Sequence, residues 1–269
     1  MRAAGCVFAE DEAALLIAAT TDAGELEALV ARRIAGEPLE YVLGWVEFAG
    51  LRLAVAPGVF VPRRRTELLV RLALRSLRSA VGASRNDLAG DDGFETPLHG
   101  SSTIGGSVLE VCCGVAPVAT AVKRRMPQAS VVASDLDPAA VAAARRNLEP
   151  LGGAVVEGDL FAGLPAGARF DVIVANAPYV PTDEVRNMPR EARDFEHALA
   201  LDGGADGLAL HRRIAGEAAT WLKPGGTLLV ETSRRQASVD LEIFESHGWR
   251  AEIARDDELD ATAVCAVRA

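Results

Sequence analysis

A carboxamide, a rigid turn and an aromatic ring follow one another in this chain at Asn176, Ala177, Pro178 and Tyr179. They come directly after the apolar run 170–175, which is typical of a buried strand. The Asn176 side-chain oxygen can accept a hydrogen bond, and Pro178 restricts Ala177 to extended backbone, which directs the Ala177 carbonyl the same way. Two acceptors and a ring can hold a planar NH2 by both hydrogens, with Tyr179 against its flat face. The segment predicts a site that turns a nitrogen lone pair toward an electrophile.

Five short apolar segments alternate with helix-like stretches along the chain. This pattern predicts an α/β fold with a doubly wound, mainly parallel sheet. The segments are 108–116, 131–138, 155–161, 170–175 and 226–231. Each strand ends in an acid, a glycine or the asparagine above, and ligands of such sheets bind beyond the carboxyl ends of the strands.

The order of these parts resembles that of the class I S-adenosylmethionine-dependent methyltransferases. Three segments narrow the resemblance to the release-factor glutamine methyltransferase family, and they are FVPRRRTE at 60–67, NAPY at 176–179 and ALDGGADGL at 200–208. The Asn-x-Pro-Tyr pattern alone is shared by DNA adenine, RNA guanine and protein glutamine methyltransferases. Its co-occurrence with the other two segments is what narrows the resemblance to the glutamine methyltransferases. The resemblance runs from about residue 37 to residue 236. It implies a Rossmann-like fold, S-adenosylmethionine as cofactor and, as substrate, a glutamine side-chain amide in a release factor.

The resemblance also implies which residues hold the cofactor. Asp135 is expected to accept from the ribose hydroxyls, the role that an acid plays in dinucleotide folds. Asp159 is placed to accept from the adenine amino group, with Leu160 and Phe161 flanking the ring, while Glu110 organises the loop after the first strand. The full expected set is Glu110, Cys112, Gly114, Asp135, Leu136, Asp159, Leu160 and, at the reacting end, Asn176.

The loop after the first strand departs from the family pattern of three glycines at alternate positions. Gly114 is the one glycine kept, and Cys112 and Ala116 occupy the other two places. Any of these positions that requires a positive φ is strained by a side chain. Either the loop holds the cofactor with an altered geometry, or the chain has lost cofactor binding and become a scaffold.

The chemistry required of such a site is modest. The sulfonium methyl is intrinsically reactive, so the protein needs mainly to place the nitrogen lone pair about 3 Å away along the S–C axis and to exclude water. Two acceptors on an amide NH2 would favour its pyramidalisation and stabilise the positive charge that grows on nitrogen. No His, Cys or metal is required, and no general base is assigned. His197 is near in sequence, but a loop histidine accounts for it at least as well.

Domain organisation follows from composition. We expect a small lobe at 1–56, with helical spacing over 10–35 followed by a β-hairpin at 40–55, and a methyltransferase domain at 57–269. In the resembling family such a lobe helps to recognise the protein substrate. Residues 81–106 are rich in Gly, Ser and Asp, which predicts a flexible insertion.

Charge and hydropathy exclude several classes of protein. Residues 1–80 hold equal numbers of acidic and basic side chains, so the formal net charge of −10 arises in residues 81–269. An acidic catalytic half argues against a nucleic-acid groove, because phosphate binding needs a basic stripe. No apolar run is long enough to span a membrane, and Glu10, Asp11 and Glu12 replace the apolar core of a signal peptide, so we expect a cytoplasmic protein. The spacing of the cysteines suits neither zinc nor disulfides and predicts free buried thiols at Cys6, Cys112, Cys113 and Cys265. Oligomeric state is not legible.

Substrate identity stays open at this level. The same two acceptors would take any planar NH2, including the guanidino group of free arginine or an amine in secondary metabolism. The acids of segment 183–196 could bind a guanidinium, but arginines are interleaved with them, so a solvated mixed-charge loop is the better account. The triplet Arg63, Arg64 and Arg65 either contacts an acidic partner or a loop near the active site, or begins a solvated helix.

Overall fold

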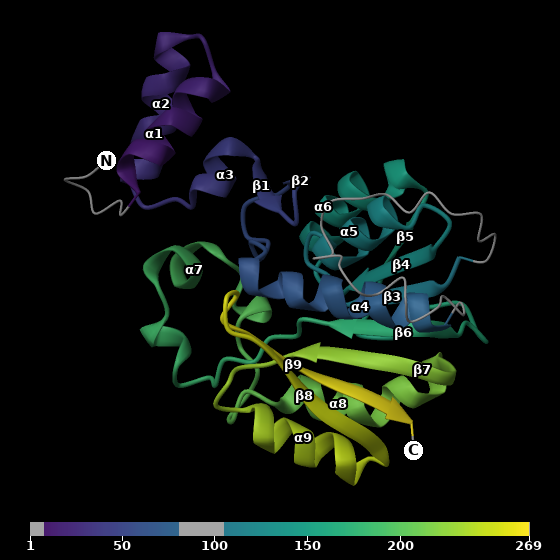
Figure 1. Cartoon of the computed structure of the whole chain (residues 1–269). Coiled ribbons are helices and arrows are strands. Elements are labelled where there is room, and N and C mark those ends of the chain that lie inside the picture. The colour runs from purple at the N-terminus through teal and green to yellow at the C-terminus, as the bar shows by residue number, and fades with distance from the viewer. Residues whose placement is uncertain (1–7, 81–104, 269) are drawn as a thin grey trace.

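The computed structural model describes residues 8–80 and 105–268 (Figure 1). Its main sheet has the strand order β5-β4-β3-β6-β7-β9-β8, in which β3 to β7 are parallel and β9 is antiparallel to both of its neighbours. The strands are β3 Ser107–Val111, β4 Ser130–Asp135, β5 Ala154–Glu157, β6 Phe170–Ala175, β7 Leu222–Glu231, β8 Trp249–Asp256 and β9 Ala261–Arg268. The predicted doubly wound, mainly parallel sheet is confirmed, and β8 and β9 extend it.

Alternate residues of the central strands face two separate cores. In β6, Val172 and Val174 pack under one set of helices, whereas Ile173 and Ala175 pack under another. The first set is α4 Glu67–Ala80, α5 Pro117–Arg125 and α6 Pro138–Leu148, and the second is α8 Ala209–Glu217 and α9 Ala237–Ser246. Because both faces are covered, the strands read as continuous apolar runs rather than as alternating patterns.

Strand register aligns the residues that matter at one edge of the sheet. Val111 pairs with both Ser134 and Ala175, and Ala175 pairs with Val230. The residue that follows each of these positions therefore lies in one row along the carboxyl edge. That row consists of Cys112, Asp135, Asn176 and Glu231.

The N-terminal region holds helices and a two-stranded sheet at one end of the molecule (Figure 1). Its elements are α1 Ala9–Ala19, α2 Ala23–Ile34, α3 Leu39–Leu43, β1 Trp45–Phe48 and β2 Leu51–Ala54. The expectation that the hairpin begins at residue 40 is wrong. Pro38 precedes α3 and Gly44 ends it with φ +78, so the chain makes a short helix before the strand begins.

Two polar contacts connect this region to the rest of the chain. Arg33 donates to Glu12 within the helical pair and also pairs with Glu191 across to α7 Arg190–Phe195. The side-chain amide of Asn147, on α6, accepts from the Ala54 N–H at 2.8 Å and donates to the Ala54 carbonyl at 3.0 Å.

Two further expectations from the sequence concern the insertion at 81–106 and membrane-spanning segments. Most of the predicted insertion at 81–106 lies outside the described residues, and Gly105 and Gly106 lead directly into β3. None of the helices in the described ranges is both long and apolar enough to cross a bilayer.

Candidate active site

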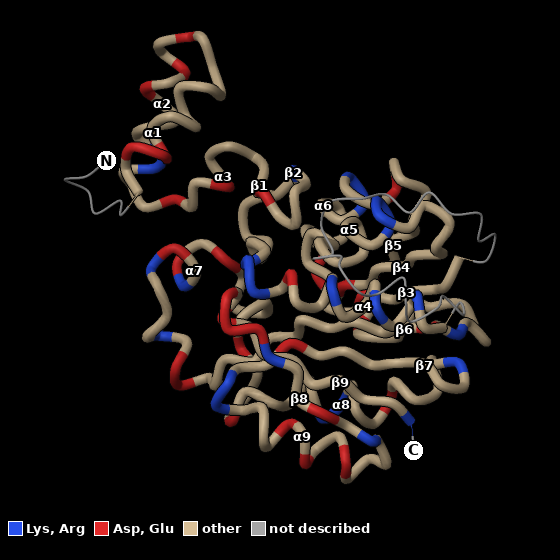
Figure 2. The backbone as a smooth tube through the Cα atoms, viewed as in Figure 1, with Lys and Arg blue, Asp and Glu red and all other residues tan. Residues whose placement is uncertain are grey.

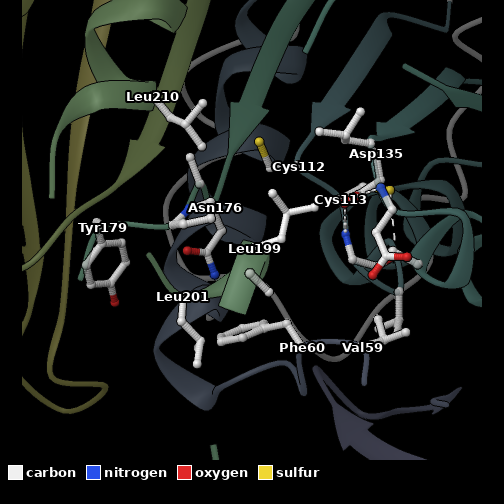
Figure 3. A pocket seen from close by; sticks show the side chains of 18 of the residues that line it. Val59, Phe60, Cys112, Cys113, Asp135, Asn176, Tyr179, Leu199, Leu201 and Leu210 are labelled. Atoms are coloured by element: carbon white, nitrogen blue, oxygen red, sulfur yellow. Dashed lines mark hydrogen bonds between the residues drawn. The ribbon is translucent and has the colours of Figure 1, made fainter. Parts of the chain in front are cut away.

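A cavity of about 270 Å³ opens at the carboxyl edge of the sheet (Figure 3). Its wall combines the ends of the central strands with segment 59–66 and segment 199–201. All members of the expected catalytic turn and of the expected cofactor set line it, and these are Glu110, Cys112, Gly114, Asp135, Leu136, Asp159, Leu160, Asn176, Ala177, Pro178 and Tyr179. In Figure 3, Asn176 lies centrally, with Tyr179 on one side and Asp135 on the other.

The Asn176 carboxamide is held by its nitrogen. Nδ2 donates to the hydroxyl oxygen of Thr66 at 3.2 Å, which leaves Oδ1 as the atom available to the cavity. The next residue, Ala177, is 1% exposed, and no donor in the described part of the chain bonds to its carbonyl. Neither predicted acceptor therefore has a competing donor within residues 8–80 and 105–268.

Tyr179 is fixed at both its hydroxyl and its backbone. The hydroxyl donates to Glu231 Oε1 at 3.3 Å, and the Arg65 guanidinium lies 5.9 Å from the ring centre. The side chain of Gln236 donates to the Tyr179 carbonyl at 2.9 Å. Burial raises the pKa of Tyr179 well above its ordinary value, so the phenol stays neutral and serves as a wall.

The segment 200–208 packs against the turn 176–179, called the catalytic turn below, and holds it through backbone hydrogen bonds. Val180 donates to the Leu201 carbonyl, and Gly203 donates back to the Val180 carbonyl. Gly207 has φ +81, and a Cβ there would stand 2.3 Å from the Tyr179 carbonyl oxygen. Glycine is required at this point because the two backbones touch.

The loop after β3 adopts left-handed backbone at all three places where the family pattern puts glycine. The φ angles are +51 at Cys112, +53 at Gly114 and +58 at Ala116. The predicted strain is therefore real at two of the three positions, since a Cβ in this region costs about 1 kcal/mol or more. The loop keeps the shape that the family glycines provide and holds it against local strain.

We expect Cys112→Gly to stabilise the protein by roughly 0.5 to 1 kcal/mol, because relief of left-handed strain outweighs the extra freedom of glycine in the unfolded chain. Denaturant unfolding measures the change. Cys113→Gly is the matched control, since Cys113 is buried and is not among the positive-φ residues, so the same replacement should destabilise. Equal destabilisation by both variants would contradict strain at Cys112.

Two acids organise the loop. Glu110 is 2% exposed and accepts from the backbone N–H of Val118 at 3.3 Å and of Ala119 at 2.6 Å, at the start of α5. Burial raises the pKa of Glu110 to about 8. Asp135 accepts from Gly114 N at 2.8 Å through Oδ2 and from the Asp137 backbone at 2.9 Å through Oδ1. Each Asp135 oxygen keeps a lone pair for a ribose hydroxyl.

At the end of the cavity where the adenine is expected, Asp159 has a partner that the sequence did not predict. Asp159 is engaged by both terminal nitrogens of Arg213, from α8, at 3.0 and 3.1 Å. Leu136 is 49% exposed on the cavity wall and offers an apolar face for a base. The expectation that Phe161 flanks the adenine is wrong, because Phe161 is buried and stacks on Trp221 with ring centres 5.9 Å apart.

The opposite wall is apolar and carries one buried ion pair behind it. Phe60, Leu199 and Leu201 line the cavity beside Asn176 (Figure 3). Behind them, Arg63 pairs at 2.5 Å with Glu196, whose side chain is 1% exposed. Arg63 thus contacts a loop near the active site, as one of the triplet alternatives predicted, and Arg65 binds Glu231 at the end of β7. The side chains of Arg64 and Arg65 are both exposed.

The mixed-charge segment 183–196 is partly as predicted. Arg190 and Arg193 pair with Asp194 on its exposed surface. Glu196 is the exception, because it is buried and holds the loop that carries Val61. His197, in the adjoining loop, contacts Asp137 through Nδ1 at 2.7 Å at the edge of the cavity.

The cysteines of the described chain are free, as expected. Cys113 is buried, whereas Cys112 and Cys265 are partly exposed. Burial raises the pKa of Cys112 and Cys113 well above the ordinary thiol value, so both stay protonated and unreactive. Cys6 lies outside the described residues.

Three functional candidates were missed by sequence reasoning. Thr66 and Glu231 contact the catalytic turn, and Arg213 holds Asp159. Glu231 did carry a signal, since it is the acid that ends a predicted strand. Thr66 lies within the segment 60–67 that carries the family resemblance, but neither it nor Arg213 could be given a contact, because their partners are far away in the chain.

Comparison with known proteins agrees with this geometry. A family model described as a methyltransferase domain matches residues 108–196. A release factor glutamine methyltransferase of Geobacter sulfurreducens is 39% identical over 223 residues, covering 82% of this chain and 69% of that protein. A 4-amino-L-phenylalanine/4-methylamino-L-phenylalanine methyltransferase of Streptomyces pristinaespiralis is 34% identical over 220 residues, covering 81% and 69%.

Among solved structures, the 16S rRNA N2 G1207 methyltransferase of T. thermophilus superposes with a TM-score of 0.51 at 20% identity, covering 84% of this chain and 50% of that one. This likeness concerns the fold alone. Identity at the level of the Geobacter protein, over four-fifths of the chain and with the Asn-x-Pro-Tyr turn in the cavity wall, shows that the chain belongs to the release factor glutamine methyltransferase family of S-adenosylmethionine-dependent enzymes.

Proposed function

We propose that this N-methyltransferase acts on the side-chain amide of a glutamine in a release factor. The observation that carries the proposal is the pair of unoccupied acceptors, Asn176 Oδ1 and the Ala177 carbonyl, set beside the Tyr179 ring in one cavity with Asp135. The Geobacter relative, named for that substrate, supports it.

The cavity fits S-adenosylmethionine on its own chemistry. Asp135 offers lone pairs for ribose hydroxyls, Leu136 offers an exposed apolar surface for a base, and the loop at Cys112 and Gly114 brings backbone to the cavity wall. We therefore assign these residues to the cofactor. When bound, S-adenosylmethionine supplies an electrophilic sulfonium methyl.

The protein's part in the reaction is orientation and charge stabilisation. Asn176 and Ala177 accept the two N–H groups of the substrate amide, which weakens conjugation of its nitrogen lone pair and stabilises positive charge that grows there. Tyr179 packs on the flat face of the amide and limits its rotation. The apolar wall of Phe60, Leu199 and Leu201 excludes water.

We assign protein docking to the N-terminal lobe, residues 1–56, with 57–269 as the methyltransferase domain. The described part of the lobe exposes large apolar side chains at Phe8, Ile17 and Ile34, which are 68%, 62% and 47% exposed. Exposed apolar groups of this size suit a protein partner. A cytoplasmic location, where release factors act, belongs to the same proposal.

A small-molecule substrate is the second candidate. It is favoured by the Streptomyces pristinaespiralis relative, whose name gives the amine of an amino acid as its substrate. Free arginine offers a planar NH2 of the same kind. Among the described residues, Lys and Arg are interspersed with acidic residues along the backbone rather than gathered in one basic stripe (Figure 2), which does not favour a nucleic acid.

A competition assay separates these substrates. The protein is incubated with methyl-labelled S-adenosylmethionine and an equimolar mixture of release factor, free arginine and 4-amino-L-phenylalanine, and the label is followed by mass spectrometry. We expect label on the release factor and none on the two amino acids. Label on either amino acid with an unlabelled release factor would replace the proposed substrate with that small molecule.

A further inference from the structure

Thr66 connects the substrate clamp to a buried carboxylate. It is the last residue of the short helix η2 Arg64–Thr66 and is 1% exposed. Its Oγ1 receives the Nδ2–H of Asn176 at 3.2 Å, a contact between residues 110 positions apart. The hydroxyl therefore touches the group on which orientation of the substrate depends.

Glu231 stands next to this pair because of sheet register. Ala175 pairs with Val230, so Asn176 and Glu231 are neighbours at the edge of adjacent strands. The Glu231 side chain is 3% exposed, and its Oε1 accepts from Tyr179 and Arg65. Its Oε2 is buried and has no hydrogen-bond partner within the described residues.

The Thr66 hydroxyl lies beside that carboxylate, because it contacts Asn176, the neighbour of Glu231 at the sheet edge. Burial raises the pKa of Glu231, whereas the Thr66 hydroxyl, the Arg65 guanidinium and the Tyr179 hydroxyl lower it. The ionised carboxylate is thus supported by several donors. Thr66 is the donor that also meets Asn176.

The number of donors and acceptors on the Thr66 hydroxyl determines which end of the Asn176 carboxamide faces it. A hydroxyl has one proton and two lone pairs, and an ionised carboxylate can only accept. With its proton turned toward the unpartnered Oε2 of Glu231, the Thr66 hydroxyl has only lone pairs left for Asn176. Lone pairs attract the N–H side of the carboxamide and repel its oxygen, so Nδ2 faces Thr66 and Oδ1 faces the cavity.

The reversed amide would defeat the reaction. It would present N–H groups to a substrate NH2, so that donor meets donor and one acceptor of the clamp is lost. The two orientations have almost the same shape, so packing alone selects weakly between them. Selection must come from hydrogen bonding.

We propose that Thr66 is a positioning residue for methyl transfer, which fixes the Asn176 carboxamide with its oxygen toward the substrate nitrogen. The inference rests on the proposed function only in requiring a substrate that bears an NH2. It assigns to the Glu231 carboxylate the role of accepting a hydrogen bond from the Thr66 hydroxyl.

The test compares Thr66→Val with Thr66→Ser. Valine keeps the shape but removes the hydroxyl, so we expect kcat to fall roughly 10-fold or more, while the KM for substrate and the Kd for S-adenosylmethionine change less than about threefold. Serine keeps the hydroxyl and should retain most of the activity. A Ser variant as impaired as the Val variant, or a Val variant with wild-type kcat, would overturn the inference.

A second background isolates orientation from general damage. In Asn176→Asp both side-chain atoms are oxygens, so the group presents an acceptor to the substrate whichever way it faces. Adding Thr66→Val there should lower kcat less than about threefold, which gives a clear coupling energy between the two sites. The same loss in both backgrounds would show that Thr66 acts through packing and would overturn the inference.

Failure of the proposed substrate looks different from failure of this inference. A wild-type enzyme that leaves the release factor unlabelled but methylates 4-amino-L-phenylalanine would refute the former. The Thr66 comparison would then be made on that amine, with the same expected fall in kcat.

Discussion

Asn176→Ala lowers kcat for methyl transfer by at least about 100-fold, the usual loss when a preorganised polar group at a transition state is removed. The reason is that Oδ1 is the only one of the two clamp acceptors that a side-chain change can delete, and the Ala177 carbonyl alone cannot hold both N–H groups. The Kd for S-adenosylmethionine should change less than about threefold, because Asp135 and the β3 loop are untouched. Single-turnover kinetics with labelled cofactor give the first quantity and calorimetric titration gives the second.

Asn187→Ala is a matched control for this variant. Asn187 is exposed and is not among the residues that line the cavity, so its kcat should equal that of the wild type. If Asn176→Ala keeps a substantial part of the wild-type activity, the two-acceptor clamp is wrong.

Asp135→Ala acts in the opposite way and weakens the cofactor first. We expect the Kd for S-adenosylmethionine to rise roughly 10- to 100-fold, since hydrogen bonds to a charged group contribute about 1.5 to 3 kcal/mol. The loss has two parts, because Asp135 both offers acceptors to the ribose and holds the Gly114 N–H. At saturating cofactor, kcat should recover most of its wild-type value.

Asp257→Ala controls for the loss of one carboxylate, since the Asp257 side chain is 86% exposed and lies outside the cavity. Its Kd should match the wild type. Titration of the wild type with S-adenosylmethionine also tests whether the altered loop after β3 still binds the cofactor. Tight binding would show that Cys112 and Ala116 preserve its function, and absence of binding would contradict the cofactor assignment.

The central part of the fold was legible in the sequence because parallel strands are covered on both faces and therefore read as plain apolar runs. The β4 and β6 runs end at Asp135 and just before Asn176, as their chemistry required. The outer strands β8 and β9 were not foreseen. Both contain alanines, and charged residues interrupt β8, a composition that intrinsic strand preference does not mark.

The site residues that directly follow the ends of strands could be predicted from the sequence. Left-handed strain at Cys112 could be anticipated because the position is one where relatives place glycine. The bonds from Thr66 to Asn176 and from Arg213 to Asp159 could not, because they depend on which distant segments the register brings together. Phe161 was misassigned for a related reason, since a ring in the turn after a predicted strand gives no sign of whether it faces the cavity or the core.

The most direct test of the account locates the transferred methyl group. A release factor carrying ¹⁵N in its glutamine side-chain amides is methylated with methyl-labelled S-adenosylmethionine and analysed by tandem mass spectrometry, followed by acid hydrolysis. We predict one labelled methyl on a glutamine side chain and release of ¹⁵N-methylamine on hydrolysis, which places the methyl on the amide nitrogen. Label on a carboxylate, a hydroxyl or a main-chain atom would contradict the nitrogen clamp at Asn176 and Ala177.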